Sequence, residues 1–242
     1  MNIKLQRWID RYLGQVLCSL GSLFSTRRKT PTQDPRSILV ILLSEMGSLV
    51  LAYPMFNYLR TRYPDTRIYS LVFRKNREVL ELLEVMEPDA ILTIDDTSAG
   101  AFIGDSLGVI RRLRKLKLDA VVDCELFARV SSLLSPLSGA PLRAGFHRHT
   151  QEGLYRGSFI NRPALYNPYL HIGQQFLTLA LALESETYPR AKRKIDAVLP
   201  TAPPKHFAED EVAEYFNQLF EVHPGLAGSR LVLVYPGGGA LP

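Results

Sequence analysis

Acidic side chains follow two strongly apolar runs of the chain, where they could take part in acid–base chemistry. Glu45 follows the run SILVILLS at 37–44, and a carboxylate there could act as a general base or bind a sugar hydroxyl. Gly47 and Ser48 come next. The glycine would allow a tight turn, and the serine would cap the following helix, whose free N–H groups attract anions. The alternative is that both residues serve only as turn and cap.

A second group of charged residues follows the apolar run at 120–124. Glu125 closes the sequence Asp-Cys-Glu, and Arg129 lies four residues later. On a helix this spacing allows a local ion pair. Alternatively, Glu125 and Arg129 line the same cleft as Glu45, because ligands of open α/β sheets bind beyond the carboxyl ends of the strands.

The segment 145–169 is dense in side chains that could hold a charged sugar. Its polar and aromatic residues are His147, Arg148, His149, Tyr155, Arg156, Asn161, Arg162, Tyr166 and Tyr169. Arginine and histidine could bind anionic oxygens, and tyrosine rings could stack on sugar rings. A loop of this length is often functional. The alternative is an ordinary solvated loop.

Missing motifs exclude several classes of site. The sequence has neither GxGxxG nor GxxxxGK[ST], so it lacks the dinucleotide fingerprint and the Walker-type phosphate loop. No GxSxG elbow or Cys/His nucleophile pattern occurs, and the histidines lack a metal-ligand spacing. Cys18 and Cys124 exclude a disulfide scaffold and are interpreted as buried thiols of a reducing compartment.

Alternating strands and helices must position these side chains. The 242 residues, 46% of them apolar, suffice for one full domain but not for two. The expected strands are 37–44, 67–73, 90–94, 120–124 and, as the last, 142–146. The expected helices are 49–63, with Pro54 kinking it or marking a late start, 76–85, 107–118, 130–137, 170–184 and 208–220. This alternation predicts an α/β fold with a doubly wound, Rossmann-like parallel sheet.

The N-terminal segment carries the charge of the whole chain. Residues 1–36 have a net charge of +5 and the rest is neutral, which argues against nucleic-acid binding by the body of the protein. Residues 3–24 repeat apolar side chains at helical spacing between flanking cations, and the longest uncharged stretch, 12–26, is too short to span a bilayer. We expect 1–30 to form an amphipathic helix in an anionic membrane interface. The alternatives are a helix packed on its own domain and a signal peptide, whose cleavage site would be poor.

The C-terminal segment predicts a further strand. The run RLVLVY at 230–235 precedes Pro-Gly-Gly-Gly, and a lone strand cannot bury both faces. We therefore expect a second α/β domain to begin here; the alternative is a strand on the edge of the first sheet. The expected division is 1–30 as the interface helix, 36–205 as the Rossmann-like domain, and 206–242 as a linker helix with the first strand of a truncated domain.

Three stretches of the sequence resemble the family 9 glycosyltransferases, the heptosyltransferase group. They are RSILVILLSEMGSLVLAYPMFNYLRTRYPDTRIYSLVF, LDAVVDCELFARVSSLLSPLSGAPLRAGF and LVLVYPGGG, within 35–242. The resemblance implies a two-domain GT-B fold whose N-terminal domain binds a lipid-linked, lipopolysaccharide-core acceptor and whose C-terminal domain binds a nucleotide-sugar, typically ADP-heptose. It implies a bacterial enzyme at the cytoplasmic face of the inner membrane, with no cofactor and no essential metal.

The resemblance also assigns roles to residues of this chain. The family's usual Gly-Asp, whose aspartate is the proposed base, corresponds to Gly47-Ser48, and serine is a poor base at neutral pH. Glu45, three residues earlier, is therefore the expected catalytic base or acceptor ligand, with Ser48 at the start of the helix. The acceptor side is expected to comprise Gly47, Glu125, Arg129, Arg148, Tyr155 and Arg156, and the donor turn Gly237, Gly238 and Gly239.

Three hypotheses for the function follow. The first is an inverting glycosyltransferase, of which this chain is the acceptor-side half and inactive by itself. The second is a non-catalytic, membrane-attached glycan-binding paralogue or fragment, which Ser48 in place of aspartate favours. The third is a nucleotide-binding α/β protein of another class, which predicts nucleotide affinity in this chain.

Overall fold

The computed structural model divides the chain into two compact units, Met1–Pro203 and Pro204–Pro242. It describes residues 10–23, 34–43, 46–126, 128–148, 155–184 and 199–232. The predicted boundary at 205/206 lies close to this division. That the second unit opens a donor-binding domain stays a prediction.

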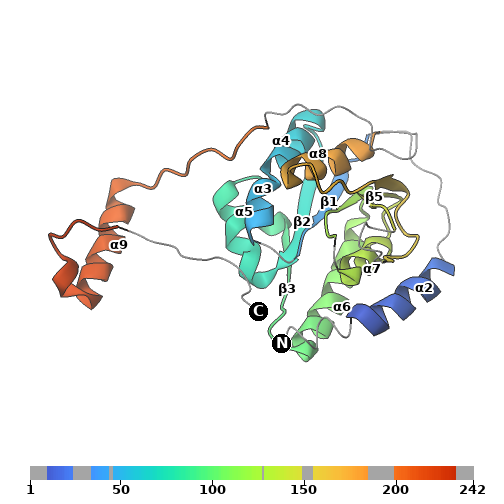
Figure 1. Ribbon diagram of the computed structural model, residues 1–242, viewed down its shortest axis with the longest axis horizontal. Helices are drawn as coiled ribbons and strands as arrows, with labels where there is room; N and C mark the ends of the chain where they lie inside the picture. The colour runs from blue at the N-terminus through green and yellow to red at the C-terminus, as the bar shows by residue number, and fades with distance from the viewer. Residues whose placement is uncertain are drawn as a thin grey trace. The chain divides into compact units, whose positions relative to one another are not determined.

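Six parallel strands among the described residues form one sheet in the first unit (Figure 1). They are β1 (Ser37–Ile41), β2 (Arg67–Phe73), β3 (Ile91–Ile94), β4 (Ala120–Asp123), β5 (Leu142–Phe146) and β6 (Arg162–Ala164). Their order is β3-β2-β1-β4-β5-β6, and every neighbouring pair is parallel. The predicted doubly wound α/β fold is confirmed, with its switch in strand order between β1 and β4.

Two apolar cores cover the two faces of this sheet. Alternate residues of β1 belong to different cores: Ile38 and Val40 to one, Leu39 and Ile41 to the other. All four side chains are fully buried. A parallel strand covered on both faces needs such a continuous apolar run, which is why 37–44 lacks the alternation of a half-exposed strand.

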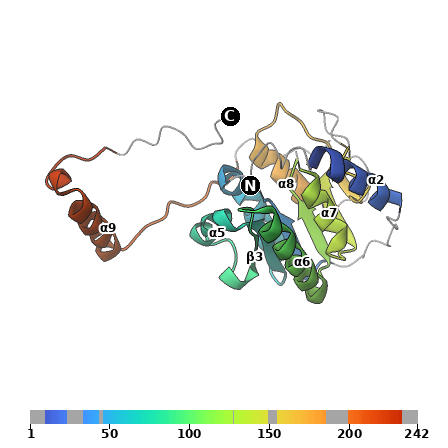
Figure 2. The same cartoon turned by 90° about the horizontal axis from the view of Figure 1, so that it is seen from below.

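Helices form a layer on each face. They are α3 (Met46–Leu51), α4 (Tyr53–Arg62), α5 (Arg77–Leu83), α6 (Ala99–Leu116), α7 (Arg129–Leu137) and α8 (Ile172–Ala182). The core with Ile38 includes residues of α3, α4, α5 and α8, and the core with Leu39 includes residues of α6 and α7. Figure 2 shows α6 and α7 side by side. Pro54 lies in the first turn of α4, so it marks a late start rather than a kink within one helix.

The N-terminal segment forms a π-helical turn, η1 (Asp10–Gly14), that continues into α2 (Gln15–Leu23). It packs against α7 through its small side chains: Gly14 lies against Arg129, and Cys18 is fully buried (Figure 2). The predicted helix is confirmed for its described residues, and so is the alternative that it contacts its own domain. Residues 1–9 and 24–30 of the prediction lie outside the described residues.

Two further elements of the first unit differ from the sequence-based prediction. α6 begins at Ala99 rather than Leu107, because Ser98 caps it by accepting a hydrogen bond from the Ala101 N–H at 3.1 Å. Three glycines in its first ten residues hid this start, since glycine disfavours helix. β6 follows β5, so 142–146 is not the last strand. Pro163 hid it, since proline is tolerated only in edge strands such as this one.

The second unit contains α9 (Glu209–Val222) and the short η4 (Pro224–Leu226). The N–H of Ala208 donates to the Glu211 carboxylate at 3.1 Å, and the first turn of α9 is acidic, as the positive end of a helix favours. Of the predicted strand 230–235, residues 230–232 are described and are not in a strand. Its remainder lies outside the described residues.

Candidate functional site

Glu125 lies at the carboxyl ends of the two central strands, where the strand order switches. Its Oε1 accepts a hydrogen bond from the Leu43 N–H at 2.6 Å, and its side chain is buried. Leu43 follows β1 and Glu125 follows β4, and these strands are neighbours. This is the position at which open α/β sheets bind ligands.

Asp123 and Arg156 form a buried ion pair beside Glu125. The Arg156 Nη2 donates to the Asp123 carboxylate and to the Ser131 hydroxyl, each at 2.8 Å. The N–H of Glu125 donates to the same carboxylate at 3.2 Å. Burial raises the pKa of Asp123, while the nearby Arg156 cation acts in the opposite direction. The pair joins the end of β4 to α7 and to the segment 155–158.

Arg129 joins three parts of the chain. Its Nε donates to the Tyr155 carbonyl at 2.9 Å, and its guanidinium pairs with the Asp10 carboxylate at 3.3 Å. Its own N–H, at the start of α7, donates to that carboxylate at 2.8 Å. Ser22 makes a second link from α2, because its hydroxyl accepts hydrogen bonds from the Tyr155 hydroxyl and the Ser158 N–H.

Arg148 is the exposed cation of this region. It follows β5, and its Nη1 donates to the Ser158 hydroxyl at 3.3 Å. Its carbonyl accepts a hydrogen bond from the Arg156 N–H at 3.0 Å. Gly157 follows with a φ of +81°, a conformation that favours glycine.

The predicted first turn is only partly within the described residues. Ser48 lies inside α3 and not ahead of it, so its predicted place as the helix cap is wrong. Gly47 also lies within α3, is exposed, and has no left-handed φ, so the helix does not require a glycine there. Glu45 lies outside the described residues, as do Gly237, Gly238 and Gly239.

The structure therefore brings five of the predicted acceptor-side residues into one region. Glu125, Arg129, Arg148, Tyr155 and Arg156 are linked through α7 and the segment 155–158. Arg129 and Arg156 are nevertheless 5% and 2% exposed and point to protein partners rather than into an open cleft. Their acceptor-binding role stays a prediction.

The partners that hold these residues were not predicted from the sequence. They are Asp10, Ser22 and Ser131, together with Asn76, which contacts Leu43, the partner of Glu125. Asp10 and Ser22 lie more than 100 positions from their partners along the chain, so no local pattern could reveal them. Asn76 offered a signal, since a polar residue beyond β2 lies at the same edge of the sheet as Glu125.

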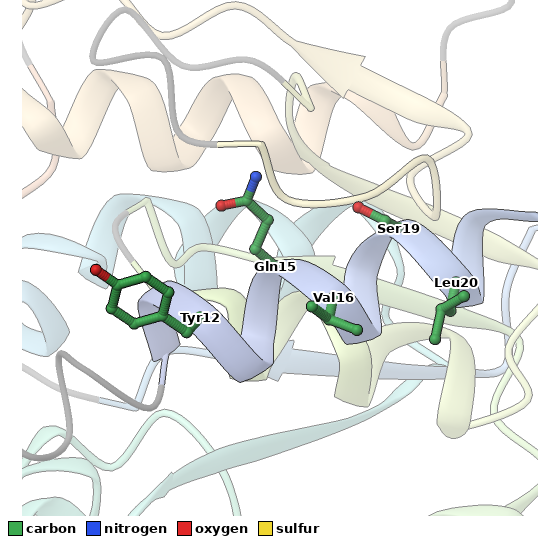
Figure 3. Close-up of a pocket in the computed structure, with 5 residues that line it drawn as sticks. All are labelled: Tyr12, Gln15, Val16, Ser19 and Leu20. Carbon is green, nitrogen blue, oxygen red and sulfur yellow. The ribbon is translucent and has the colours of Figure 1, made fainter.

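The outer face of α2, continued into η1, is apolar and exposed. Its side chains Tyr12 and Leu13 of η1 and Val16, Leu17, Leu20 and Leu23 of α2 are between 43% and 78% exposed. A shallow hollow runs along this helix, lined by Tyr12, Gln15, Val16, Ser19 and Leu20 (Figure 3). None of the helices that the structure describes is both long and apolar enough to cross a bilayer. The described residues also contain no group of three or more His, Cys, Asp or Glu side chains placed to hold a metal.

Comparisons with known proteins point to one group of enzymes, although no family model matches the chain. Lipopolysaccharide heptosyltransferase 3 of Escherichia coli K12 is 22% identical over 165 residues, which cover 63% of this chain and 47% of that protein. The structure of E. coli ADP-heptose lipopolysaccharide heptosyltransferase II matches with a TM-score of 0.55 and 19% identity, over 76% of this chain and 50% of that one. A family 9 glycosyltransferase of Veillonella parvula matches with a TM-score of 0.53 and 18% identity, over 80% and 51%.

These matches confirm the Rossmann-like fold that the sequence predicted. The chain spans about half the length of the curated relative and of the solved structures that it matches. In sequence and in fold, the described α/β unit is therefore heptosyltransferase-like, as its resemblance to the family 9 glycosyltransferases predicted.

Proposed function

We propose that the protein is a glycosyltransferase that moves a sugar, heptose, from ADP-heptose to a lipopolysaccharide-core acceptor, and that this chain supplies the acceptor side. The observation that carries the proposal is the convergence of Glu125, Arg148 and Tyr155 at the carboxyl edge of a sheet whose relatives are heptosyltransferases. That edge is where a ligand of an open α/β sheet binds.

Direct displacement at the sugar needs a base that takes the proton of the acceptor hydroxyl as the sugar–phosphate bond breaks. We assign this role to Glu45, three residues before Ser48 in the sequence. Arg148 is exposed and would contact anionic groups of the acceptor. Arg129 and Arg156 are occupied by protein partners, so we assign them to holding the segment 155–158 in place.

The test is a transfer assay with ADP-heptose and a heptose-deficient core acceptor, using the protein translated from the complete reading frame. Glu45→Gln keeps the size of the side chain and removes the base, so turnover is expected to fall at least about 100-fold. Glu81→Gln, on the exposed surface of α5, is the matched control. Turnover of Glu45→Gln within twofold of the parent would remove Glu45 from the catalytic role.

The second candidate function is a glycan-binding protein without catalysis, which the hydroxyl of Ser48 in place of a carboxylate favours. Titration calorimetry of this chain separates the candidates. Binding of the core oligosaccharide without transfer by the full-length protein would favour the binding protein. Binding of ADP by this chain alone would instead favour the third hypothesis, a nucleotide-binding protein of another class.

We further propose that the outer face of α2 binds the anionic surface of the cytoplasmic side of a bacterial inner membrane. The support is charge complementarity: exposed apolar side chains such as Val16 and Leu20 lie in a segment flanked by Lys4 and Arg7 on one side and by 27–29, Arg-Arg-Lys, on the other. A helix of this kind lies in the interface with its apolar face among the acyl chains.

Point variants test this proposal better than deletion of 1–30, because Asp10 and Ser22 also hold the body of the domain. Val16→Glu with Leu20→Glu is expected to abolish co-sedimentation with phosphatidylglycerol vesicles. Leu82→Glu, an equally exposed leucine on α5, is the control and should bind as the parent does. Equal binding by the α2 variant and the parent would reject the assignment.

A further inference from the structure

The peptide group of Leu43 is held from both neighbouring strands of the sheet. On the β4 side its N–H donates to the Glu125 Oε1 at 2.6 Å. On the β2 side its carbonyl accepts from the Asn76 Nδ2 at 2.8 Å and from the Phe73 N–H at 3.2 Å. Leu43 thus has both of its backbone polar groups satisfied by residues from the two flanking elements.

On the β4 side, the contact with Glu125 begins where backbone pairing with β1 ends. Backbone pairing from β4 reaches the Cys124 N–H, which donates to the Ile41 carbonyl at 2.9 Å. Two residues after Ile41, at Leu43, the Glu125 carboxylate accepts the hydrogen bond that a backbone carbonyl of β4 would otherwise accept. On this side β1 is thereby extended by a side chain, whereas on the β2 side the backbone pairing continues through the Phe73 N–H.

Both side chains are buried, which is energetically unfavourable for a polar group. Asn76 is 1% exposed and Glu125 is 5% exposed. A buried amide or carboxylate lowers stability unless it is hydrogen-bonded, so such residues are poor choices where only packing is needed. An apolar side chain at position 125 would leave the Leu43 N–H without this acceptor, and one at position 76 would remove one of the two donors to the Leu43 carbonyl.

We propose that Asn76 and Glu125 are positioning residues that fix the Leu43 peptide and, through it, the position of α3, where Gly47 and Ser48 lie. Two residues separate Leu43 from the start of α3, so a shift at Leu43 reaches this helix with little room for compensation. The inference rests on the proposed function, in which this end of the sheet carries the acceptor chemistry.

The first test is kinetic and uses the full-length protein. Glu125→Leu and Asn76→Asp each remove one hydrogen bond to Leu43, and Asn76→Asp does so without a change of shape. Misplacement of reacting groups by about 1 Å can cost about 100-fold in rate, so kcat is expected to fall by that order with the KM for ADP-heptose within twofold. Glu125→Gln keeps an acceptor oxygen and is expected to retain most of kcat.

Asn161→Leu is the matched control. The Asn161 side chain also makes two backbone contacts, to the Arg143 N–H at 2.8 Å and to the Pro141 carbonyl at 2.7 Å, but at the other end of β5. It is expected to lower stability and leave kcat unchanged. If kcat of Asn161→Leu fell as much as that of Glu125→Leu, general destabilisation would explain the loss of activity, and the proposal would be overturned.

The second test does not depend on catalysis. Amide hydrogen exchange, followed by mass spectrometry on peptides that cover 46–52, is expected to be faster in Asn76→Asp and Glu125→Leu and unchanged in Asn161→Leu. Unchanged exchange in folded Asn76→Asp would overturn the positioning role. If the parent protein shows no transfer, the proposed function fails, while the exchange experiment still decides whether Asn76 and Glu125 hold the start of α3.

Discussion

Asp10 caps a helix that begins 119 residues later in the sequence. Its carboxylate accepts a hydrogen bond from the Arg129 N–H at 2.8 Å, at the first residue of α7. Ala128, in the N-cap position, has no polar side-chain atom for this purpose. The N-terminal segment therefore completes a helix of the sheet domain, and it does so next to the residues that hold the segment 155–158.

The cap predicts a measurable loss of stability. Asp10→Ala removes the acceptor and leaves the buried Arg129 guanidinium short of a counter-charge, so the free energy of unfolding should fall by about 1–2 kcal/mol. Asp10→Asn keeps an acceptor oxygen and should therefore retain a large part of the stability that Asp10→Ala loses. Urea unfolding followed by circular dichroism measures both. Equal losses for the two variants would show that the cap contributes nothing.

The ion pair of Asp123 and Arg156 predicts strong non-additivity. Arg156→Met leaves the fully buried carboxylate without its cation, and a broken buried pair costs about 3–5 kcal/mol. Adding Asp123→Leu removes the stranded charge, so the double variant should be more stable than the sum of the two single losses predicts. A double-mutant cycle from chemical unfolding gives the coupling. Additive losses would mean that the pair does not act as a unit.

Gly157 and Gly104 should respond to alanine in opposite directions. Gly157 has a φ of +81°, and an added Cβ would meet the ring of Phe159, so Gly157→Ala should be destabilising by more than about 1 kcal/mol. Gly104 lies on the exposed side of α6, where an added Cβ meets nothing within 4 Å. Gly104→Ala should therefore stabilise the protein by up to about 1 kcal/mol. Thermal melting curves of the two variants test both signs, and destabilisation by Gly104→Ala would contradict the account of α6.

Cys18 and Cys124 should be unreactive in the folded protein. Burial raises the pKa of Cys18 to about 11 from 9.0, and burial also raises the pKa of Cys124. The thiolate is the reactive form, so a disulfide reagent at pH 8 should label both thiols only after unfolding. The Cys18 thiol ionises at a lower pH in the unfolded chain than in the folded protein. Its contribution to the free energy of unfolding should therefore be lost as the pH rises from about 9 to about 11. Rapid labelling of either cysteine in the folded protein at pH 8 would contradict its burial.

The strands of the sheet could be predicted from the sequence where a single run of residues specifies the strand. The runs at 67–73 and 142–146 match β2 and β5 at both ends. The continuous apolar run at 37–44 contains β1, as a parallel strand buried on both faces requires. The prediction failed where the conformational preference of a residue was overruled by its surroundings in the folded protein. The glycines of α6 disfavour helix and Pro163 disfavours strand, yet the Ser98 cap and the edge position of β6 permit both elements.

The roles of the charged residues needed the tertiary structure. The sequence placed Glu125, Arg129 and Arg156 near one edge of the sheet, because the ends of parallel strands share that edge. It could not show that Arg129 pairs with Asp10, that Arg156 pairs with Asp123, or that Glu125 holds the Leu43 peptide.

The amino-acid sequence by itself determined the α/β class, the main strands and the amphipathic character of the first helix, because each depends on periodicity within about 20 residues. Only the tertiary structure decided which charges are buried and which face of α2 stays exposed. Those outcomes depend on contacts between residues far apart in the chain, and chain folding alone sets which of the available partners lie within hydrogen-bonding distance.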